Sequence, residues 1–243
     1  MPLRAFTTSW DDGNPLDLKL ADLLAKYGFQ GTFYIPRNNA EGAVIDTAGL
    51  RELAERFEIA SHTLDHVELD TVPANVASQQ IVDGKRRLED ELGAPIVGFC
   101  YPRGVHNPAI RAAVKHAGFR YARTVVNFAT ESPSDLLRVP TTLQFFPHRP
   151  YTYLKNFASG RDWHARAAMF SIALRNRFED TLQQMLAHVC THGGVFHVWG
   201  HSWELERFGL WGALERFLKA AQQVVPNERR VDNATAYAAI ASS

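Results

Sequence analysis

Two adjacent carboxylates and two histidines four residues apart are the side chains of this sequence whose types and spacing could do chemistry. Asp11 and Asp12 end a strand-like run and precede a glycine, and His62 and His66 follow about fifty residues later. One carboxylate and two imidazoles can hold a divalent ion and leave positions open for water and substrate. The second carboxylate is then free to act as a base. Together the four residues supply the groups needed for metal-assisted hydrolysis.

Each half of this set also has a plain structural interpretation. Asp-Asp-Gly alone is typical of a turn, because Asp and Gly are common turn formers, and a histidine pair alone can be a coincidence of the surface. An acidic pair at the end of a buried strand is harder to explain, because burying charge is costly without a partner or a metal. Two histidines at i and i+4 share a face if their segment is helical, so one ion can contact both. Taken together, the residues indicate a metal site.

The bulk composition excludes several classes of protein. The chain has 243 residues, which suits one domain over residues 1–243 with a large core. Its 26 basic and 26 acidic residues give no net charge, so we expect neither a nucleic-acid partner nor a polybasic membrane patch. Cys100 and Cys190 are too few for a disulfide framework. We see no signal peptide and no run near the ~20 apolar residues of a membrane helix, and therefore expect a cytoplasmic protein without membrane insertion.

Strand-like and helix-like segments alternate along the chain. The predicted strands are residues 6–10, 31–35, 58–61, 96–101, 120–124 and 194–200, with a short one near 230–231. The predicted helices are residues 15–27, 47–57, 73–92, 107–118, 164–189 and 211–225, with a last one from 233. Repeated βα units imply a parallel sheet with helices outside, and about seven units in one domain favour an α/β barrel over an open sheet.

The segment 127–161 interrupts this rhythm. It contains four prolines and many aromatic residues, and we expect loops and short strands there. Its aromatic side chains, with the tryptophan that follows, form either a wall on which a sugar stacks or a hydrophobic lid packed on the barrel. These residues are Phe145, Phe146, Tyr151, Tyr153, Phe157 and Trp163. His148 lies among them and is a candidate to reach the site.

The candidate site residues all lie at the C-terminal ends of predicted strands. Asp11 and Asp12, His62, residues 101–104 and His201 all come just after predicted strands. In α/β barrels the chemistry sits at the C-terminal ends of the strands. The positions of these residues therefore support one common site.

Three segments in this order resemble the first three motifs of the NodB-type polysaccharide deacetylases, carbohydrate esterase family 4. They are Ser9-Trp10-Asp11-Asp12-Gly13, Ser61-His62-Thr63-Leu64-Asp65-His66 and Phe99-Cys100-Tyr101-Pro102-Arg103-Gly104. The resemblance runs from about Thr7 to His201 and beyond. It implies a distorted (β/α)7 barrel of the TIM type, a divalent ion and the hydrolysis of N-acetyl groups on sugars. The implied ion is zinc, with cobalt or a similar ion as an alternative.

The resemblance also implies roles for individual residues. Asp11 is similar to the family's catalytic base and Asp12 to its carboxylate metal ligand, while His62 and His66 match the two histidine ligands. The residue before Gly104 is the one whose backbone N–H faces the oxyanion in the family. By that correspondence the donor here is Arg103.

The last motif and two departures leave alternatives open. His201, after the apolar strand, resembles the general acid of the family, and His197 has the same strand parity and is the second candidate. Many members have an arginine at the position of Cys100, where it steadies the catalytic aspartate, and Arg103 or another basic residue must take over that task. The aspartate-tryptophan pair that tunes the acid histidine has only a poor match at Asp162-Trp163.

We therefore expect a metal-dependent hydrolase that removes the N-acetyl group from an N-acetylated sugar or glycan precursor, whether nucleotide-linked, lipid-linked or small. Two alternatives remain. The same site could act on another C–N bond, as a deformylase of a formamido-sugar or an amidase on a cyclic ureide. The protein could also be a sugar-binding protein that has lost catalysis, although the four intact site residues argue against this. The sequence leaves the oligomeric state open.

Overall fold

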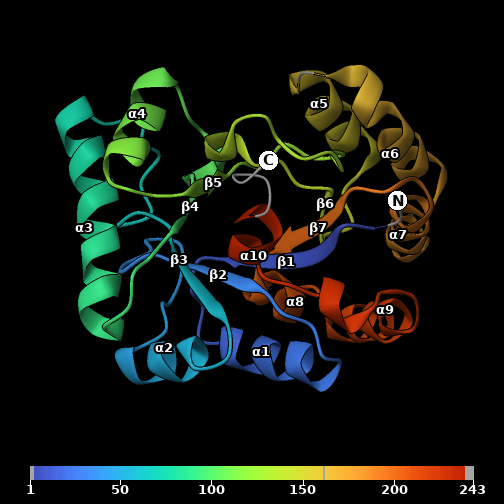
Figure 1. The fold of residues 1–243 in the computed structure, drawn as a ribbon, viewed down its shortest axis with the longest axis horizontal. Helices are drawn as coiled ribbons and strands as arrows, with labels where there is room; N and C mark the ends of the chain where they lie inside the picture. The colour runs from blue at the N-terminus through green and yellow to red at the C-terminus, as the bar shows by residue number, and fades with distance from the viewer. Residues whose placement is uncertain (1–2, 161, 239–243) are drawn as a thin grey trace.

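Seven parallel strands form one curled sheet at the centre of the molecule, in the order β5-β4-β3-β2-β1-β7-β6 (Figure 1). The computed structural model describes residues 3–160 and 162–238. The strands are β1 (Ala5–Asp11), β2 (Thr32–Ile35), β3 (Glu58–Ser61), β4 (Gly98–Cys100), β5 (Tyr121–Arg123), β6 (Leu143–Gln144) and β7 (Val195–Gly200). This confirms the predicted α/β fold with a curled parallel sheet of the barrel type.

The barrel is completed on one side by an irregular segment, residues 139–142. The backbone N–H of Val139 donates to Ala122 O at 2.9 Å and the N–H of Thr124 donates to Val139 O at 2.8 Å, so this segment lies against β5. On its other side, the N–H of Thr142 donates to His197 O in β7 at 2.8 Å. The seam between β5 and β7 is therefore built partly from hydrogen bonds outside the regular strands, which is the distortion of this barrel.

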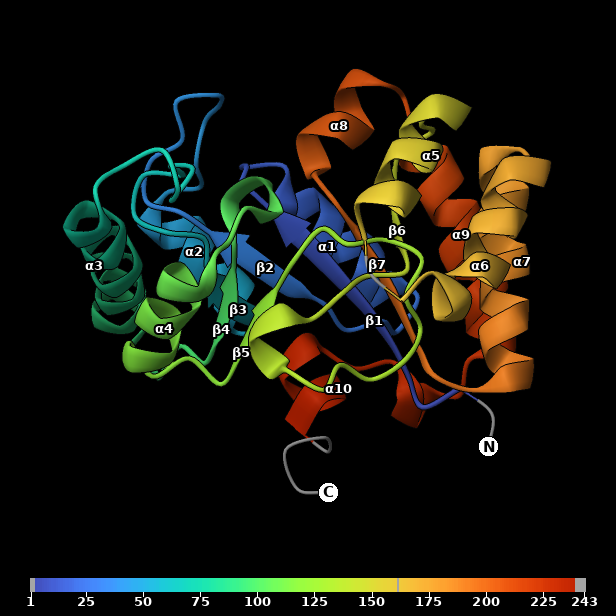
Figure 2. The same ribbon diagram turned by 90° about the horizontal axis from the view of Figure 1, so that it is seen from above.

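Helices surround the outside of the sheet (Figure 1). They are α1 (Asp17–Lys26), α2 (Thr47–Ala54), α3 (Ala74–Leu92), α4 (Pro108–His116), α5 (Pro150–Ser159), α6 (Trp163–Arg175), α7 (Phe178–His192), α8 (Ser202–Arg207), α9 (Trp211–Val224) and α10 (Asn233–Ala238). Figure 2 shows α5 and α8 at one end of the barrel and α10 at the other. No described helix is both long and apolar enough to cross a membrane.

Local sequence signals explain several helix ends. The Asp46 side chain accepts a hydrogen bond from the Gly49 N–H at 2.8 Å and begins α2, and Asn107 does the same for α4 through the Ile110 N–H at 2.9 Å. Gly93 adopts a left-handed conformation, with φ of 65°, and ends α3.

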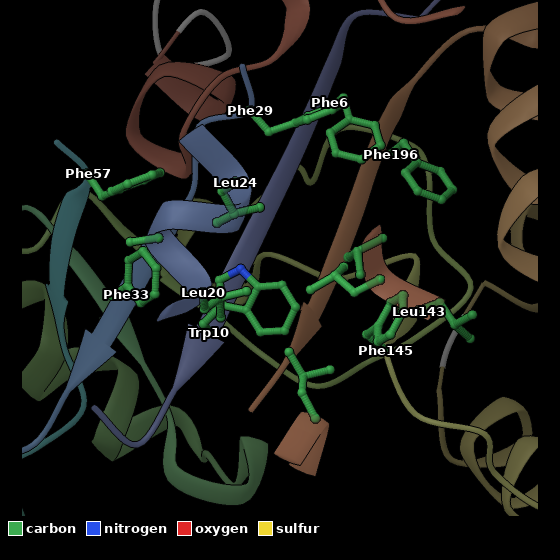
Figure 3. Close-up of a cluster of buried hydrophobic side chains, with 14 of the residues drawn as sticks. Phe6, Trp10, Leu20, Leu24, Phe29, Phe33, Phe57, Leu143, Phe145 and Phe196 are labelled. Atoms are coloured by element: carbon green, nitrogen blue, oxygen red, sulfur yellow. The ribbon is translucent and has the colours of Figure 1, made fainter. Parts of the chain in front are cut away.

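The two faces of β1 separate the hydrophobic core from the polar interior of the barrel. Phe6 and Trp10 point towards the helices, where Phe6 contacts Phe29 and Phe196 with ring centroids 4.8 and 5.4 Å apart (Figure 3). Side chains alternate along a strand, so the odd-numbered residues of β1 face the other way. These are Ala5, Thr7, Ser9 and Asp11, and the last three each have a buried polar partner on another element. The same alternation places Asp11 at the C-terminal edge of the interior.

Three sequence predictions were wrong in detail. The single helix expected over residues 164–189 is two helices, α6 and α7, because Asn176 is extended and its side-chain amide donates to Ile172 O at 2.8 Å, which ends α6. The insert 127–161 contains a helix, α5, which begins with Pro150 at its first position; residue 161 lies outside the described residues. Residues 230–231 form no strand but a single bridge from Phe6 to Arg230.

Glu58, at the start of β3, carries a carboxyl group whose protonation differs between the folded and unfolded chain. It accepts hydrogen bonds from Thr32 Oγ1 at 2.6 Å, Tyr121 Oη at 2.9 Å and the Ala234 N–H at 3.0 Å. Burial nevertheless raises its pKa from 4.5 to about 7. The folded state therefore holds this proton up to about pH 7, whereas the unfolded chain releases it near pH 4.5.

We expect the free energy of unfolding to fall as pH rises from 4.5 to 7 and to level off above, by about 3 kcal/mol at most from this group. Glu58→Gln cannot ionise, so its stability relative to the wild type should increase over the same pH range. Urea unfolding at pH 5, 6, 7 and 8 measures this, with Glu55→Gln, at an exposed residue, as control. A constant difference between Glu58→Gln and the wild type across these pH values would contradict the assignment.

Candidate metal centre

A cleft of about 380 Å³ opens at the C-terminal end of the barrel strands, the end at which α5 and α8 lie (Figure 2). Loops after β1, β3, β4, β5 and β7 contribute to its wall, together with α5 and α8. The residues that line it are Asp11, Asp12, Glu41, His62, His66, Arg103, Val125, Asn127, Gln144, His148, Thr152, Asn156, Trp199, His201, Trp203 and Glu204. The structure thus brings all six predicted site residues to one cleft.

Asp12, His62 and His66 converge at the floor of this cleft. Asp12 Oδ1 lies 3.2 Å from His66 Nε2 and 3.9 Å from His62 Nε2, and one ligand atom from each residue lies within 4.8 Å of the others. The chain turns sharply after β1, because Asp12 and Gly13 have φ of 78° and 60°. A Cβ at Gly13 would meet Ile35 Cγ2 at 2.9 Å, so this turn requires glycine.

The two histidines meet by a route different from the one predicted. Residues 62–66 form no helix; Thr63 and His66 instead have left-handed backbones, with φ of 66° and 51°. This loop brings the two rings to a centroid distance of 4.8 Å. One ion can therefore contact both rings because a tight loop brings them together. The helix that would have placed His62 and His66 on one face is not formed.

The free lone pairs at this point fit a cation. His62 Nδ1 lies 2.9 Å from Cys100 O, to which it donates, so the lone pair of His62 is on Nε2 and faces Asp12. Burial lowers the pKa of His62 to about 4, which keeps this ring neutral. Asp12 Oδ1 is buried and accepts no hydrogen bond from the described residues. A carboxylate oxygen and imidazole nitrogens of this kind are the donor set of a divalent zinc-like ion.

Asp11 is held by an arginine that the motif comparison did not identify. Arg123 Nη2, on β5, contacts both carboxylate oxygens of Asp11, and the guanidinium lies between the rings of Tyr34 and Trp199, 5.1 and 4.8 Å from their centroids. Arg123 is fully buried. Burial alone would raise the pKa of Asp11, but the charges of Arg123 and nearby histidines outweigh it, so the pKa is lowered and Asp11 is an anion at neutral pH.

The ion pair between Arg123 and Asp11 shows which basic residue contacts Asp11 in this chain, where Cys100 replaces the arginine of many family members. The thiol of Cys100 is buried, 3.8 Å from Asp11 Oδ2, and burial raises its pKa. Of the two options left open by the sequence, the other basic residue is correct: Arg123 contacts Asp11. The signal was present in the sequence as one arginine within the short apolar strand Tyr121-Ala122-Arg123, since a buried charge needs a partner.

Arg103 lies at the rim of the cleft with its side chain turned to other partners. Its guanidinium is half exposed and pairs with Glu41 and Glu68. Its backbone is left-handed, with φ of 53°, in the short 3-10 turn Pro102–Gly104 (η1). Within the described part of the chain the Arg103 N–H donates no hydrogen bond, which leaves it available to a ligand.

His201 has a carboxylate partner one helical turn further along. Its Nδ1 lies 2.8 Å from Glu204 Oε2, and its Nε2 lies 3.8 Å from Asp12 Oδ2. Burial would lower its pKa, but the hydrogen bond to Glu204 and the charges of Asp12 and Asp11 raise it to about 9. Glu204 in turn accepts from Gln144 Nε2 at 3.1 Å. Glu204, and not the poorly matching Asp162, is thus the carboxylate that contacts His201.

His197 does not reach the cleft. It is buried inside the barrel, where its Nε2 lies 2.8 Å from Ser9 Oγ and its Nδ1 lies 3.1 Å from Tyr237 Oη. Burial lowers its pKa to about 3. Of the two histidines in the last motif, the geometry therefore favours His201 as the residue that faces a ligand.

The aromatic residues of the insert mostly pack on the barrel. Phe145 and Tyr153 are buried in the core, and Phe157 stacks on Phe170 with centroids 4.1 Å apart, whereas Tyr151 and Trp163 are exposed. None of the six described aromatic side chains singled out in the sequence lines the cleft.

Trp199 and Trp203 do line the cleft, and Trp203 Nε1 donates to Asp12 Oδ2 at 2.9 Å. His148 reaches the cleft as considered, and its Nε2 lies 2.8 Å from Gln144 Oε1.

Comparison with known structures supports the fold. The chitin deacetylase from Colletotrichum lindemuthianum is 15% identical, with a TM-score of 0.61 over 96% of this chain and 89% of that one. The peptidoglycan deacetylase PdaC from Bacillus subtilis is 16% identical, with a TM-score of 0.61 over 99% of this chain and 93% of that one. At such identities the likeness shows the barrel fold.

Sequence comparison identifies the relationship. Residues 3–122 match the family model described as polysaccharide deacetylase. A curated relative from Bacillus subtilis (strain 168), named "Putative polysaccharide deacetylase YxkH", is 24% identical over 121 residues, which are 49% of this chain and 41% of that protein. The chain thus spans about two fifths of the length of this relative. Residues 3–122 of the chain therefore match the polysaccharide deacetylase family, as the three motifs predict.

Proposed function

We propose that the protein is a metal-dependent hydrolase that removes the acetyl group from the nitrogen of an N-acetylated sugar. The observation that carries this proposal is the convergence of Asp12, His62 and His66 on one point, beside an anionic Asp11 and a protonated His201. The deacetylase relatives support the choice of bond. A sugar or oligosaccharide is the substrate class that their names suggest.

Asp12, His62 and His66 would hold the ion through Oδ1 and the two Nε2 atoms. When bound there, a zinc-like ion supplies a water of lowered pKa and polarises the acyl oxygen. Zinc fits a set of one carboxylate and two imidazoles, and cobalt or a similar ion is the alternative. The hydrogen bond from His62 Nδ1 to Cys100 O fixes the ring orientation, as such outer contacts do at metal sites.

Asp11 is the base in this proposal. Its carboxylate lines the cleft next to Asp12, and it stays ionised because Arg123 lies against both of its oxygens. An ionised carboxylate at this point can accept the proton of the attacking water. The arginine also prevents the Asp11 side chain from turning away, so the oxygens keep one orientation.

Arg103 and His201 are proposed to act on the two other atoms whose charge changes during amide hydrolysis, the acyl oxygen and the leaving amine. The unpaired backbone N–H of Arg103 can donate to the oxygen that becomes negative, and one donor of this kind is typically worth ~3 kcal/mol. His201 carries a proton on Nε2 at neutral pH, because its pKa of about 9 keeps the ring doubly protonated while Nδ1–H donates to Glu204. It can give that proton to the amine, which is otherwise a poor leaving group.

We expect about one zinc-like ion per chain in the purified protein, and its loss in Asp12→Ala and His66→Ala, because each substitution removes one of three protein ligands. Metal analysis after dialysis measures this. His116→Ala, an exposed histidine on α4, is the control and should keep the ion. Wild-type metal content in both ligand variants would place the ion elsewhere.

We expect Asp11→Asn to lower kcat for acetate release, expressed per metal-loaded chain, by at least about 100-fold, because the amide cannot accept a proton. Acetate release from N-acetylated sugars by the zinc-loaded protein is the assay, with the exposed Asp90→Asn on α3 as control. Activity of Asp11→Asn within about threefold of the wild type would remove Asp11 as the base. Release of formate, or a ring-opened product, instead of acetate would favour the deformylase or amidase alternative.

A further inference from the structure

Asn127 lines the cleft without a role in the chemistry proposed above. It follows β5, in the insert that the sequence left unexplained, and its side chain is 1% exposed. Its backbone carbonyl accepts from Arg166 Nε at 2.8 Å, which holds this part of the loop in place. A rigid, buried amide on the wall of a cleft is a candidate to contact a ligand.

The hydrogen bonds of Asn127 decide which of its two polar atoms faces the cleft. Oδ1 accepts from Trp199 Nε1 at 3.0 Å and from Thr141 Oγ1 at 2.8 Å. An indole N–H can only donate, so the atom beside Trp199 must be the oxygen and the amide cannot be flipped. The Nδ2 group is therefore the polar end left for the cleft. No hydrogen bond links it to a described residue, and it is not among the fully buried unpaired atoms, so it is open to the cleft.

An amide donor in this position calls for an acceptor on the ligand. A donor open to the cleft binds water until a ligand displaces that water, and a ligand without an acceptor at this point would leave the donor unpaired. The donor faces the same space as Asp11 and His201, so its acceptor belongs to whatever molecule reacts there. An oxygen of that molecule, either a hydroxyl or a carbonyl, fits this requirement.

The charges around the cleft narrow the ligand further. Arg103 is the one lysine or arginine among the described residues that line it, and both Glu41 and Glu68 pair with its guanidinium. A phosphate or diphosphate would therefore meet no unpaired basic side chain there and would face several carboxylates. The cleft of about 380 Å³ also lies near the lower end of the roughly 300–1,000 Å³ found for small-molecule sites.

We propose that Asn127 is a substrate-binding residue, which donates Nδ2–H to an oxygen of an uncharged N-acylated sugar about one ring in size. This rests on the proposed hydrolase function and narrows its substrate. It favours a small neutral glycan precursor over a nucleotide-linked or lipid-diphosphate-linked one. Because Asn127 touches substrate away from the metal ligands, its loss should act on affinity for the sugar.

The test compares two sugars and three variants of the zinc-loaded full chain. Asn127→Asp keeps an oxygen for Trp199 and Thr141 but replaces the donor by an acceptor, and Asn127→Ala removes both. Thr141→Val, the matched control, removes a contact to Oδ1 and leaves Nδ2 in place. Zinc content and steady-state acetate release are measured with N-acetylglucosamine and with its 1-phosphate. Ligand-observed NMR measures binding of N-acetylglucosamine separately from turnover.

We expect both Asn127 variants to raise KM for N-acetylglucosamine about tenfold with unchanged zinc content, and Thr141→Val to stay within about threefold of the wild type. The 1-phosphate should have a kcat/KM at least about tenfold lower than the neutral sugar in the wild type.

Several results would overturn the inference. One is unchanged KM and unchanged binding in Asn127→Asp, and another is a preference for the phosphorylated sugar. A wild type that binds zinc but neither binds nor deacetylates N-acetylglucosamine would also overturn it. If the wild type binds N-acetylglucosamine through Asn127 but releases no acetate, the binding role stands and the proposed hydrolase function fails. Loss of the metal site itself would be seen in the zinc analysis of the ligand variants, independently of the sugar.

Discussion

The buried ion pair between Asp11 and Arg123 is the interaction on which the rest of the site depends. Two opposite charges inside a barrel are expensive to remove from water, and removing one partner would leave the other uncompensated. Here the pair joins the end of β1 to β5 across the interior, and the rings of Tyr34 and Trp199 cover the guanidinium. With Asp11 fixed inward, Asp12 must point another way, and the left-handed turn at Asp12 directs its carboxylate towards the two histidines.

A second set of polar contacts fixes the orientation of His201 and pairs its charge. Glu204, one turn into α8, binds Nδ1 and leaves Nε2 towards the cleft, and Gln144 and His148 extend the chain of hydrogen bonds into the insert. Each ionisable group proposed to move a proton thus has a buried partner of opposite charge. Hydrogen bonds and ion pairs of this kind fix geometry as well as charge, which is the precondition for a proton to be transferred over a short distance.

The sequence predicted the sheet, most helices and the cluster of site residues, because alternation of apolar runs, helix caps and turn glycines are local signals. Asp11, Asp12, His62 and His66 could be found from residue type and order alone. The left-handed backbone at Thr63 and His66 could not, because such conformations at residues other than glycine leave no periodic trace. The break at Asn176 was hidden as well, because helix-forming residues continue on both sides of it and a side-chain contact ends α6.

Arg123, Glu204 and Asn127 escaped prediction for a different reason. The roles of Arg123 and Asn127 depend on register between distant segments, β5 against β1 and residue 127 against Thr141 and Trp199. Glu204 lies only three residues after His201, and its role depends on the turn of α8 that brings its carboxylate to His201 Nδ1. The family motifs indicated that the arginine expected at Cys100 and the acid-tuning aspartate were missing, but they could not identify Arg123 and Glu204 as the side chains in contact with Asp11 and His201.

The residues of the site fall into two groups along the sequence, and the second group lies in the insert that contains the irregular seam beside β5. The three metal-ligand candidates and Asp11 lie within residues 11–66, on regular strands and their loops, whereas Asn127 and Gln144 belong to the insert 127–161, which contains the seam. Few regular strand hydrogen bonds constrain the seam, so its length and side chains can vary while the metal end of the cleft stays the same. Changes confined to this one segment, in evolution or by engineering, are therefore expected to alter which ligand fits the cleft and to leave Asp11, Asp12, His62 and His66 in place.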